Sequence, residues 1–594
     1  MHEFTLWAPG ASRVMLHLPG LDRREPLRPV ADPALGQEAT PETAGLWHVS
    51  VAEAEHGTDY AFALDGGDPR PDPRSAWQPD GVHQASRVFD AARHSWSDGA
   101  WPGLDSRGAV FYELHIGTFT PEGTLDAAVG RLDHLVELGV RMIELLPVAE
   151  FSGVRGWGYD GVGLYAVHHS YGGPEALQRF VDAAHGKGLG VCLDVVYNHL
   201  GPDGNYLSEF GPYFTDAHTT PWGDAINLDD EGSHGVRSWI VDNVLRWFRD
   251  FHIDCLRLDA VHALVDSSPR HILAEISERT AGLSKELGRP LGLVAESDLN
   301  DPFMVEPVAE GGRGLTGQWD DDVHHSIHSF ITGETQGYYS DFGTASVLAR
   351  VLKEAFRHAG DYSTFRGKHW GKPISPGKHR GHQFVVATQN HDQVGNRATG
   401  DRPSATIAPG RLAASAALML TSVYTPMLFM GEEWGALTPW QFFTSFESPE
   451  LADAVRQGRR AEFGSHGWAP EEVPDPQALS TRDASVLDWS EIGRVDGELD
   501  HGAMLRWYRD LIALRASSPD LLNDSFDAVT VTHGESWIAM RRGSFTTVVN
   551  IGPEADIVVA TGSVPRLTWG SIQTVDEETV RLQPDAVAVL QIQG

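Results

Sequence analysis

The stretch GVCLDVVYNH, residues 190–199, decides the fold class. It is a short apolar run that ends in carboxylate, amide and imidazole side chains. A continuous apolar run of this length is typical of a strand buried on both faces, as in a parallel sheet. Apolar residues at helical spacing precede it at 175–184 and follow it at 240–251. A strand between two such helices predicts an α/β architecture.

The same alternation extends in both directions. Further strand-like runs lie at 110–116, 142–146, 253–258, 291–295, 383–388 and 427–430. Between the first two of these, Leu125 to Val136 recur at helical spacing, which predicts one helix ended by Gly139. The number of units favours a closed (β/α)8 TIM barrel over a doubly wound sheet.

Shorter strands flank the barrel on both sides. Runs at 4–8, 14–18, 47–51 and 60–64 predict a small N-terminal β-sandwich. The Pro- and Asp-rich segment 65–80 resembles a linker or an edge loop. A helix at 504–514 and strands at 537–540, 546–549 and 587–591 predict a C-terminal β-domain. We therefore divide the chain into 1–95, a catalytic barrel at 96–500 with loop insertions at about 199–233 and 320–381, and 501–594.

Composition restricts the partners. The 594 residues carry 46 Lys and Arg against 82 Asp and Glu, a net charge of −36. This field repels phosphate backbones and anionic lipid, so we expect neither nucleic acid nor a membrane as partner. Cys192 and Cys255 form no metal-binding pair and are expected to be buried thiols. Without a signal peptide or an 18-residue apolar run, a soluble cytoplasmic protein is expected.

Polar side chains gather where four of the predicted strands end. They are Asp194, Asn198 and His199 after the third strand, Arg257, Asp259 and His262 after the fourth, Glu296 after the fifth, and Asn390, His391, Asp392, Asn396 and Arg397 after the seventh. A single Asp at a strand end is most often a helix N-cap. Four clusters on the C-terminal face of one barrel indicate an active site instead.

Two of these carboxylates suit glycoside hydrolysis with retention, which needs one ionised and one protonated carboxyl group. Arg257 lies two residues before Asp259, so both side chains share one face of the strand, and the cation should keep Asp259 ionised as a nucleophile. Glu296 follows an apolar run and has no cation beside it in sequence, which favours a raised pKa and a general acid. Asp392 could hold substrate hydroxyls.

The motifs DVVYNH, LRLDAVH, the strand-end Glu296 and QNHD resemble, in order, the four signature regions of the α-amylase superfamily. The resemblance implies Asp259 as nucleophile, Glu296 as acid/base and Asp392 as transition-state stabiliser. It further implies that subsite −1 is lined by Asp194, His199, Arg257, His391 and the stacking ring of Tyr159 in GWGYD. The opening FTLWAPGASRVMLHL resembles a starch-binding-like sandwich.

Longer stretches resemble one family within that superfamily, the malto-oligosyltrehalose trehalohydrolases. They include LRLDAVHALVDSSPRHILAEI and QWDDDVHHSIHSFITGETQGYYSDF. The resemblance implies hydrolysis of the α-1,4 bond next to a terminal trehalose unit, with the malto-oligosyltrehalose and water as reactants and a malto-oligosyltrehalose synthase acting in the same pathway without a stable complex. Further substrate contacts are expected at Leu258, Ala260, Val261, His262, Asp321, Asp322, His324, His325, Asn390, Gln393, Asn396 and Arg397.

Several alternatives stay open. Residues 320–325, DDDVHH, could be a metal site, a solvated acidic turn or a sugar-binding segment. Asn198 resembles a calcium ligand of some amylases, but the loop after it is short for a calcium domain, so we expect no metal and no cofactor. Ser297, Asp320 and the segment 444–447 depart from the pattern of the trehalohydrolases. A branching or debranching enzyme shares the barrel and the catalytic pair. A binding module without activity would have lost one of the three carboxylates, and all three are present.

Overall fold

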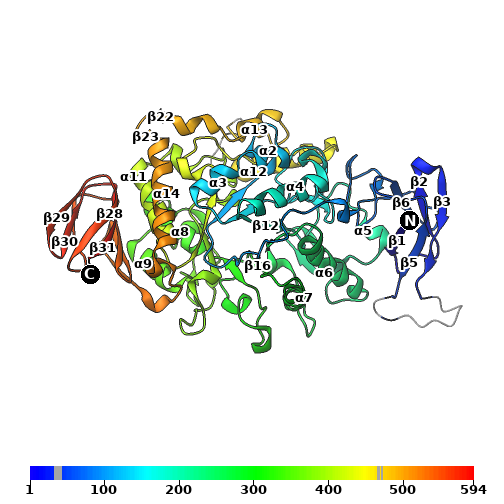
Figure 1. Ribbon diagram of the computed structural model, residues 1–594, viewed down its shortest axis with the longest axis horizontal. Helices are drawn as coiled ribbons and strands as arrows, with labels where there is room; N and C mark the ends of the chain where they lie inside the picture. Colours follow the sequence, from blue (N-terminus) through cyan, green and yellow to red (C-terminus); the bar gives the residue numbers. More distant parts are fainter. Residues whose placement is uncertain (32–39, 41–42, 465–468, 470–471, 594) are drawn as a thin grey trace.

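Eight parallel strands close into a barrel at the centre of the computed structural model, which describes residues 1–31, 40, 43–464, 469 and 472–593 (Figure 1). The barrel strands are β8 (Phe111–Leu114), β9 (Met142–Leu145), β12 (Gly190–Val195), β15 (Cys255–Leu258), β16 (Gly292–Ala295), β17 (Gly317–Trp319), β20 (Phe384–Ala387) and β21 (Thr425–Phe429). Strand β21 pairs with β8 and so closes the ring. The predicted TIM barrel is confirmed.

Helices surround the barrel. They are α1 (Ile116–Phe119), α2 (Leu125–Val129), α3 (Leu132–Leu138), α4 (Gly173–Gly186), α5 (Leu207–Phe210), α6 (Ser233–Asp250), α7 (Ile272–Leu287), α8 (Asp321–Thr332), α9 (Ala345–Glu354), α10 (His391–Gly395), α11 (Pro409–Leu420), α12 (Pro449–Gly464), α13 (Leu479–Ala484), α14 (His501–Ser517) and α15 (Pro519–Leu522). Helix α4 has Pro174 in its first turn and buries Leu177, Phe180 and Val181, as its amphipathic pattern requires.

Two details differ from the sequence-based prediction. The single helix expected from Leu125 to Val136 is two helices, because the chain leaves the helix at Gly130, and Val136 is exposed on the second. Gly139 ends that helix in the left-handed region, at φ 96°, where glycine is favoured. The numbering of the predicted strands leaves a place for a sixth before residue 320, but no run was assigned to it. Strand β17 fills that place, and its three residues are too few to show a period.

Two antiparallel sheets lie at the N-terminal end of the molecule (Figure 1). One holds β1 (His2–Trp7), β5 (Leu46–Val51) and β4 (Arg28–Pro29), and the other holds β3 (Arg23–Pro26), β2 (Val14–Leu18), β6 (Asp59–Leu64) and β7 (Ser86–Arg87). The segment 65–80 fastens these sheets to the barrel: the carbonyl of Pro73 accepts a hydrogen bond from Trp239 on α6, and Arg70 pairs with Glu209.

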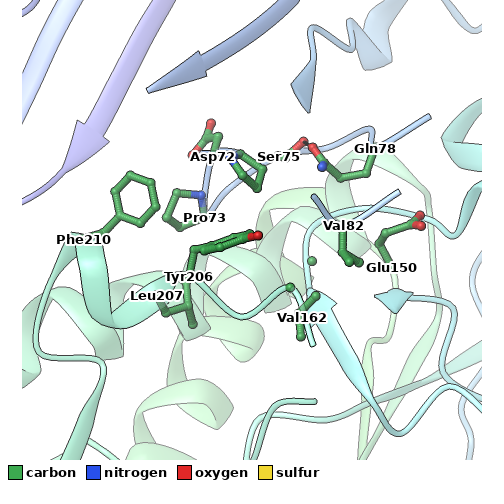
Figure 2. A pocket seen from close by; sticks show the side chains of 13 residues that line it. Asp72, Pro73, Ser75, Gln78, Val82, Glu150, Val162, Tyr206, Leu207 and Phe210 are labelled. Carbon is green, nitrogen blue, oxygen red and sulfur yellow. Dashed lines mark hydrogen bonds between the residues drawn. The ribbon is translucent and has the colours of Figure 1, made fainter. Parts of the chain in front are cut away.

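A small hollow lies under this segment, between Pro73, Gln78 and Val82 on one side and Tyr206 and Phe210 on the other (Figure 2). Its free volume is about 30 Å³. A water molecule needs roughly 10–15 Å³ of such space, whereas a sugar ring needs far more. The hollow is therefore a packing gap beside the barrel and not a sugar site.

Two further antiparallel sheets lie at the opposite end (Figure 1). The larger holds β24 (Val529–His533), β25 (Trp537–Arg542), β26 (Phe545–Asn550), β31 (Ala586–Ile592) and β28 (Ser563–Trp569), and the smaller holds β27 (Ala555–Val558), β30 (Thr579–Leu582) and β29 (Ile572–Asp576). The buried Arg515 of α14 donates to the carbonyls of Leu420, Ser422 and Tyr424, just before β21. The division of the chain near residues 95 and 500 stays a prediction.

In the part of the chain that the structure describes, four short hairpins lie in loops that follow barrel strands, the last of them after β21. They are β10 (Glu150–Phe151) with β11 (Gly161–Gly163), β13 (Phe214–Thr220) with β14 (Gly223–Ile226), β18 (Tyr362–Ser363) with β19 (Lys368–His369), and β22 (Val495–Asp496) with β23 (Leu499–Asp500). Among the residues described, no helix combines the length and the apolar character that crossing a bilayer would take.

Candidate active site

The guanidinium of Arg257 lies at the centre of the polar strand ends. It is fully buried, and its Nη1 lies 2.9 Å from Asp194 Oδ2 and 2.6 Å from Asp259 Oδ1. Its Nη2 lies 3.8 Å from Glu296 Oε2. The flat face of the guanidinium covers Trp319, the last residue of β17, at 4.3 Å from the ring centroid. One cation thus connects carboxylates from three neighbouring strands.

Asp259 accepts hydrogen bonds on both of its carboxylate oxygens. Besides Arg257, its Oδ2 accepts a hydrogen bond from Nδ2 of Asn198 at 2.8 Å. The side chain is 11% exposed, so it faces the open end of the barrel. Donors that favour the charged form keep a carboxylate available as a nucleophile. The predicted contact between Arg257 and Asp259 is present.

Glu296 has the environment of a general acid. Burial, with smaller contributions from its charged neighbours, raises the pKa of its carboxyl group. Its Oε2 accepts the backbone N–H of Ala260 at 2.6 Å, which places it directly beside the chain that follows Asp259. No cation lies beside Glu296 in sequence, but in the fold Arg257 reaches it from the neighbouring strand. Burial outweighs that cation.

Asp392 lies on the first turn of α10, beside His391. His391 Nε2 is 3.6 Å from Asp392 Oδ1, while His391 itself is 1% exposed and Asp392 is 43% exposed. On its other side His391 contacts Glu113 of β8 through Nδ1, at 2.6 Å. The imidazole therefore lies between a carboxylate that faces the cleft and one that lies inside the barrel.

Aromatic rings border the three carboxylates. Tyr159 is stacked on His391, with ring centroids 5.0 Å apart, and its hydroxyl donates to Asp194 at 2.6 Å. His199 is stacked on Trp222, with centroids 4.4 Å apart and planes within 4°. Trp222, at the turn between β13 and β14, is 50% exposed. Its free face is a flat apolar surface of the kind that sugar rings cover.

The segment 320–325 forms the start of α8, and its residues divide into two groups. Asp322 and His324 are buried, and Asp322 Oδ2 accepts hydrogen bonds from Asn300 Nδ2 and from the backbone N–H groups of Arg357 and His358. Asp321 and His325 are half-buried. Burial and the nearby charges of Glu296 and Asp392 raise the pKa of Asp321 to about 8.

The other predicted contact residues also divide by exposure. Leu258, Ala260, Val261 and Asn390 are buried, and Asn390 caps α10 by accepting the N–H of Gln393. His262, Gln393, Asn396 and Arg397 reach the surface. Arg397 is engaged with Glu334 and Asp401, so its guanidinium is largely committed to the protein itself.

Comparison with known proteins shows the family of the chain. A family model described as the alpha amylase catalytic domain matches residues 86–220. The chain is 50% identical to a malto-oligosyltrehalose trehalohydrolase of Rhizobium sp. (strain M-11), over 99% of this chain and 97% of that protein. It is 51% identical to a malto-oligosyltrehalose trehalohydrolase of Arthrobacter ramosus, over 93% of each. The chain belongs to the malto-oligosyltrehalose trehalohydrolase family.

Solved structures extend the agreement to the whole fold. A Salmonella typhimurium crystal structure described as an alpha amylase matches with a TM-score of 0.88 and 38% identity, covering 99% of this chain and 97% of that one. Membership of the trehalohydrolase family is the reason to set aside the branching and debranching alternatives. The resemblance recognised in the motifs is confirmed.

The segment 444–447, where the chain departs from the family pattern, is packed against the strand-end loop that carries Tyr159. Ser445 Oγ accepts the backbone N–H groups of Val154 and Arg155. The approach is so close that a Cβ on Gly153 would lie 1.9 Å from the carbonyl oxygen of Ser445. Thr444 Oγ1 accepts a hydrogen bond from Gln477. This segment therefore supports the active-site loop from behind.

One group of side chains outside the site has the spacing of metal ligands. Within the described residues it consists of Glu150, His168 and His169, and residues 320–325 form no such group. His168 Nδ1 accepts the backbone N–H of Ser170, so a neutral ring carries its proton on Nε2. Nε2 of His168 then has no lone pair for a metal. Glu150 accepts the backbone N–H and the ring Nδ1–H of His169. The group is better explained as a buried hydrogen-bond network.

Proposed function

We propose that the chain hydrolyses malto-oligosyltrehalose with retention of configuration, releasing trehalose and a shorter malto-oligosaccharide. Family membership supports the substrate, because the relatives bear that name. The single observation that supports the mechanism is that Arg257 lies between Asp259 and Glu296 at the barrel mouth. It brings together one carboxylate with strong donors and one carboxyl group whose pKa burial raises.

In the first step, Asp259 attacks the anomeric carbon of the glucose in subsite −1. The bond from that carbon to the glycosidic oxygen breaks as Glu296 transfers its proton to this oxygen, and trehalose leaves. Asn198 and Arg257 hold the nucleophile below the ring by donating to its two carboxylate oxygens. Asp392, with His391 beside it, is placed to bind ring hydroxyls more tightly as the sugar flattens in the transition state.

In the second step, water replaces trehalose. Glu296, now ionised, removes a proton from the water, whose oxygen attacks the same carbon and displaces Asp259. Two inversions give net retention. The stacked Tyr159 closes the base of the −1 site, and the exposed face of Trp222 is placed to cover a sugar ring at its edge.

The trehalose unit should lie on the side of Glu296, because the general acid protonates the leaving group. His262 is exposed there, and its charge acts on Glu296. Asp322 and His324 are buried, so we propose that neither touches sugar and that Asp322 acts by holding the loop at 357–358. The upstream supply of substrate by a synthase also stays a proposal.

Replacing His262 with alanine should lower kcat/KM for maltotriosyltrehalose by about tenfold, or about 1.4 kcal/mol, because a hydrogen bond made only by the trehalose end is lost. The loss for maltopentaose should be much smaller. Asp322→Ala serves as the contrast, since a change in loop position should lower both values alike. Equal losses for both substrates in His262→Ala would place trehalose recognition elsewhere.

The proposed activity is tested by product analysis. The purified protein, dialysed against EDTA, is incubated in parallel with maltotriosyltrehalose, amylose and pullulan. We expect trehalose and maltotriose from the first and little change in the other two. Rapid cleavage of pullulan, or transfer of chains within amylose, would contradict the proposal. Loss of all activity that calcium restores would indicate a metal requirement that this mechanism lacks.

A further inference from the structure

We propose that Glu113 is a positioning residue of the active site, which holds His391 in its doubly protonated form and aims its Nε2–H at the cleft. Glu113 belongs to β8, a barrel strand that contributes none of the catalytic or substrate-binding residues assigned above. The proposal rests on the proposed function, because His391 matters only if subsite −1 is where sugar binds.

Both oxygens of Glu113 contact the same residue. Oε2 accepts the backbone N–H of His391 at 2.9 Å, and Oε1 lies 2.6 Å from its Nδ1. Both side chains are 1% exposed, so water does not compete for these contacts. An ionised carboxylate can only accept, so Nδ1 carries a hydrogen. Two bonds from one carboxylate fix both the backbone and the ring of His391.

The remaining surroundings of His391 decide its charge. Asp392 lies 3.6 Å from Nε2, and Asp194 of β12 and Arg257 of β15 act on the ring more weakly. Glu144 of β9 and His115 at the end of β8 also face it, but burial raises the pKa of the first and lowers that of the second, so both are neutral. The rings of Tyr159, Trp157 and Trp319 cover the imidazole. Burial lowers the pKa of His391, but Asp392 and Glu113 together raise it to about 9. The ring is therefore an imidazolium at neutral pH.

The charge has a chemical consequence at the cleft. As an imidazolium, His391 donates from Nδ1 to Glu113 and still has Nε2–H for Asp392 or a sugar hydroxyl. A neutral ring bound to Glu113 would keep its hydrogen on Nδ1 and present a lone pair at Nε2. That lone pair would face Asp392, a second acceptor, and the contact would become repulsive. Glu113 thus determines whether Nε2 of His391 presents a hydrogen or a lone pair to the cleft.

The test is Glu113→Gln, which keeps the shape but removes the charge. With one anion gone, the pKa of His391 falls, and the imidazolium is lost as pH rises through this lower value. We measure kcat/KM for α-maltotriosyl fluoride between pH 5 and pH 9, because fluoride leaves without a proton from Glu296. The ratio of activity at pH 8 to that at pH 5.5 should fall at least about tenfold relative to wild type.

The neighbouring Glu144→Gln is the matched control. Glu144 pairs in register with Glu113 across β8 and β9, is equally buried and has no hydrogen-bond partner. Burial and the charge of Glu113 raise its pKa far above the usual range, so it is already neutral and the change removes no charge. Its pH profile should match that of wild type. Equal shifts in both variants would overturn the proposal.

Two further measurements make the result decisive. Glu113→Asp keeps the charge on a shorter side chain, so kcat/KM should fall at every pH without a change in the profile. In wild type with 15N-labelled histidine, the His391 signals, identified by their loss in His391→Asn, should show both nitrogens protonated at pH 8. A neutral ring there overturns the proposal even if Glu113→Gln does not fold. Failure to release trehalose from maltotriosyltrehalose would count against the proposed function, separately from Glu113.

Discussion

Replacing Asp259 with alanine should lower kcat on maltotriosyltrehalose by several orders of magnitude, on the order of 10⁴-fold or more. The substitution removes the atom that attacks the anomeric carbon, while Glu296 stays in place to protonate the leaving trehalose. The Arg257 guanidinium then loses one of its two closest carboxylates but keeps Asp194. Thermal unfolding of the variant should stay close to that of wild type.

Azide makes this test specific. A small anion can enter the space that the Asp259 side chain leaves and attack the anomeric carbon from the same face. The bond from carbon to nitrogen forms as the glycosidic bond breaks, and trehalose leaves with the proton of Glu296. The product should be a β-glycosyl azide, because only one inversion takes place. An α-azide, or turnover near that of wild type without azide, would remove Asp259 from the role of nucleophile.

Glu296→Gln should lower kcat on maltotriosyltrehalose by about 10²–10⁴-fold, the range expected when a general acid is lost. The raised pKa of Glu296 keeps the acid protonated, and wild-type activity should decline as pH rises through that pKa. Glutamine does not titrate, so this decline should vanish from the profile of the variant. Measuring kcat/KM against pH for both proteins checks it.

The leaving group provides the control for Glu296. α-Maltotriosyl fluoride needs no proton to lose fluoride, so Glu296→Gln should form the glycosyl-enzyme from it at nearly the wild-type rate. Azide should then release an α-glycosyl azide, because it attacks the anomeric carbon and displaces Asp259 with a second inversion. If the variant loses activity equally on fluoride and on maltotriosyltrehalose, Glu296 acts in binding rather than in proton transfer.

The barrel could be predicted because its strands are buried on both faces and therefore appear as apolar runs. Where a strand has only three residues, as in β17, no period exists, and Trp319, which Arg257 covers, could not be assigned to the site. The apolar spacing from Leu125 to Val136 predicted one helix, but in the structure the first helix ends at Gly130. Where tertiary packing decides the local structure, the pattern of a few residues in the sequence does not predict it.

The candidate site divides in the same way. Residues at the strand ends, such as Asp259 and Glu296, were recognisable because an ionisable group after an apolar run is unusual. Glu113 lies within a strand, so its contact with His391 depends on barrel closure and was missed. Trp222 lies in a loop without any periodicity. Asp322 was predicted as a substrate contact, and its hydrogen bonds to a loop 35 residues further along the chain carry no signal in the sequence.

The arginines behind β21 make the barrel dependent on the chain that follows it. Arg515 satisfies carbonyls in the turn before β21, and Arg542 of β25 donates to Thr421 in the same turn. Removing the chain from α14 onward would take away both arginines, and the turn before β21 would lose the donors that hold its carbonyls in place. We therefore expect the barrel to fold together with the chain that follows it rather than as a part that could be cut out alone.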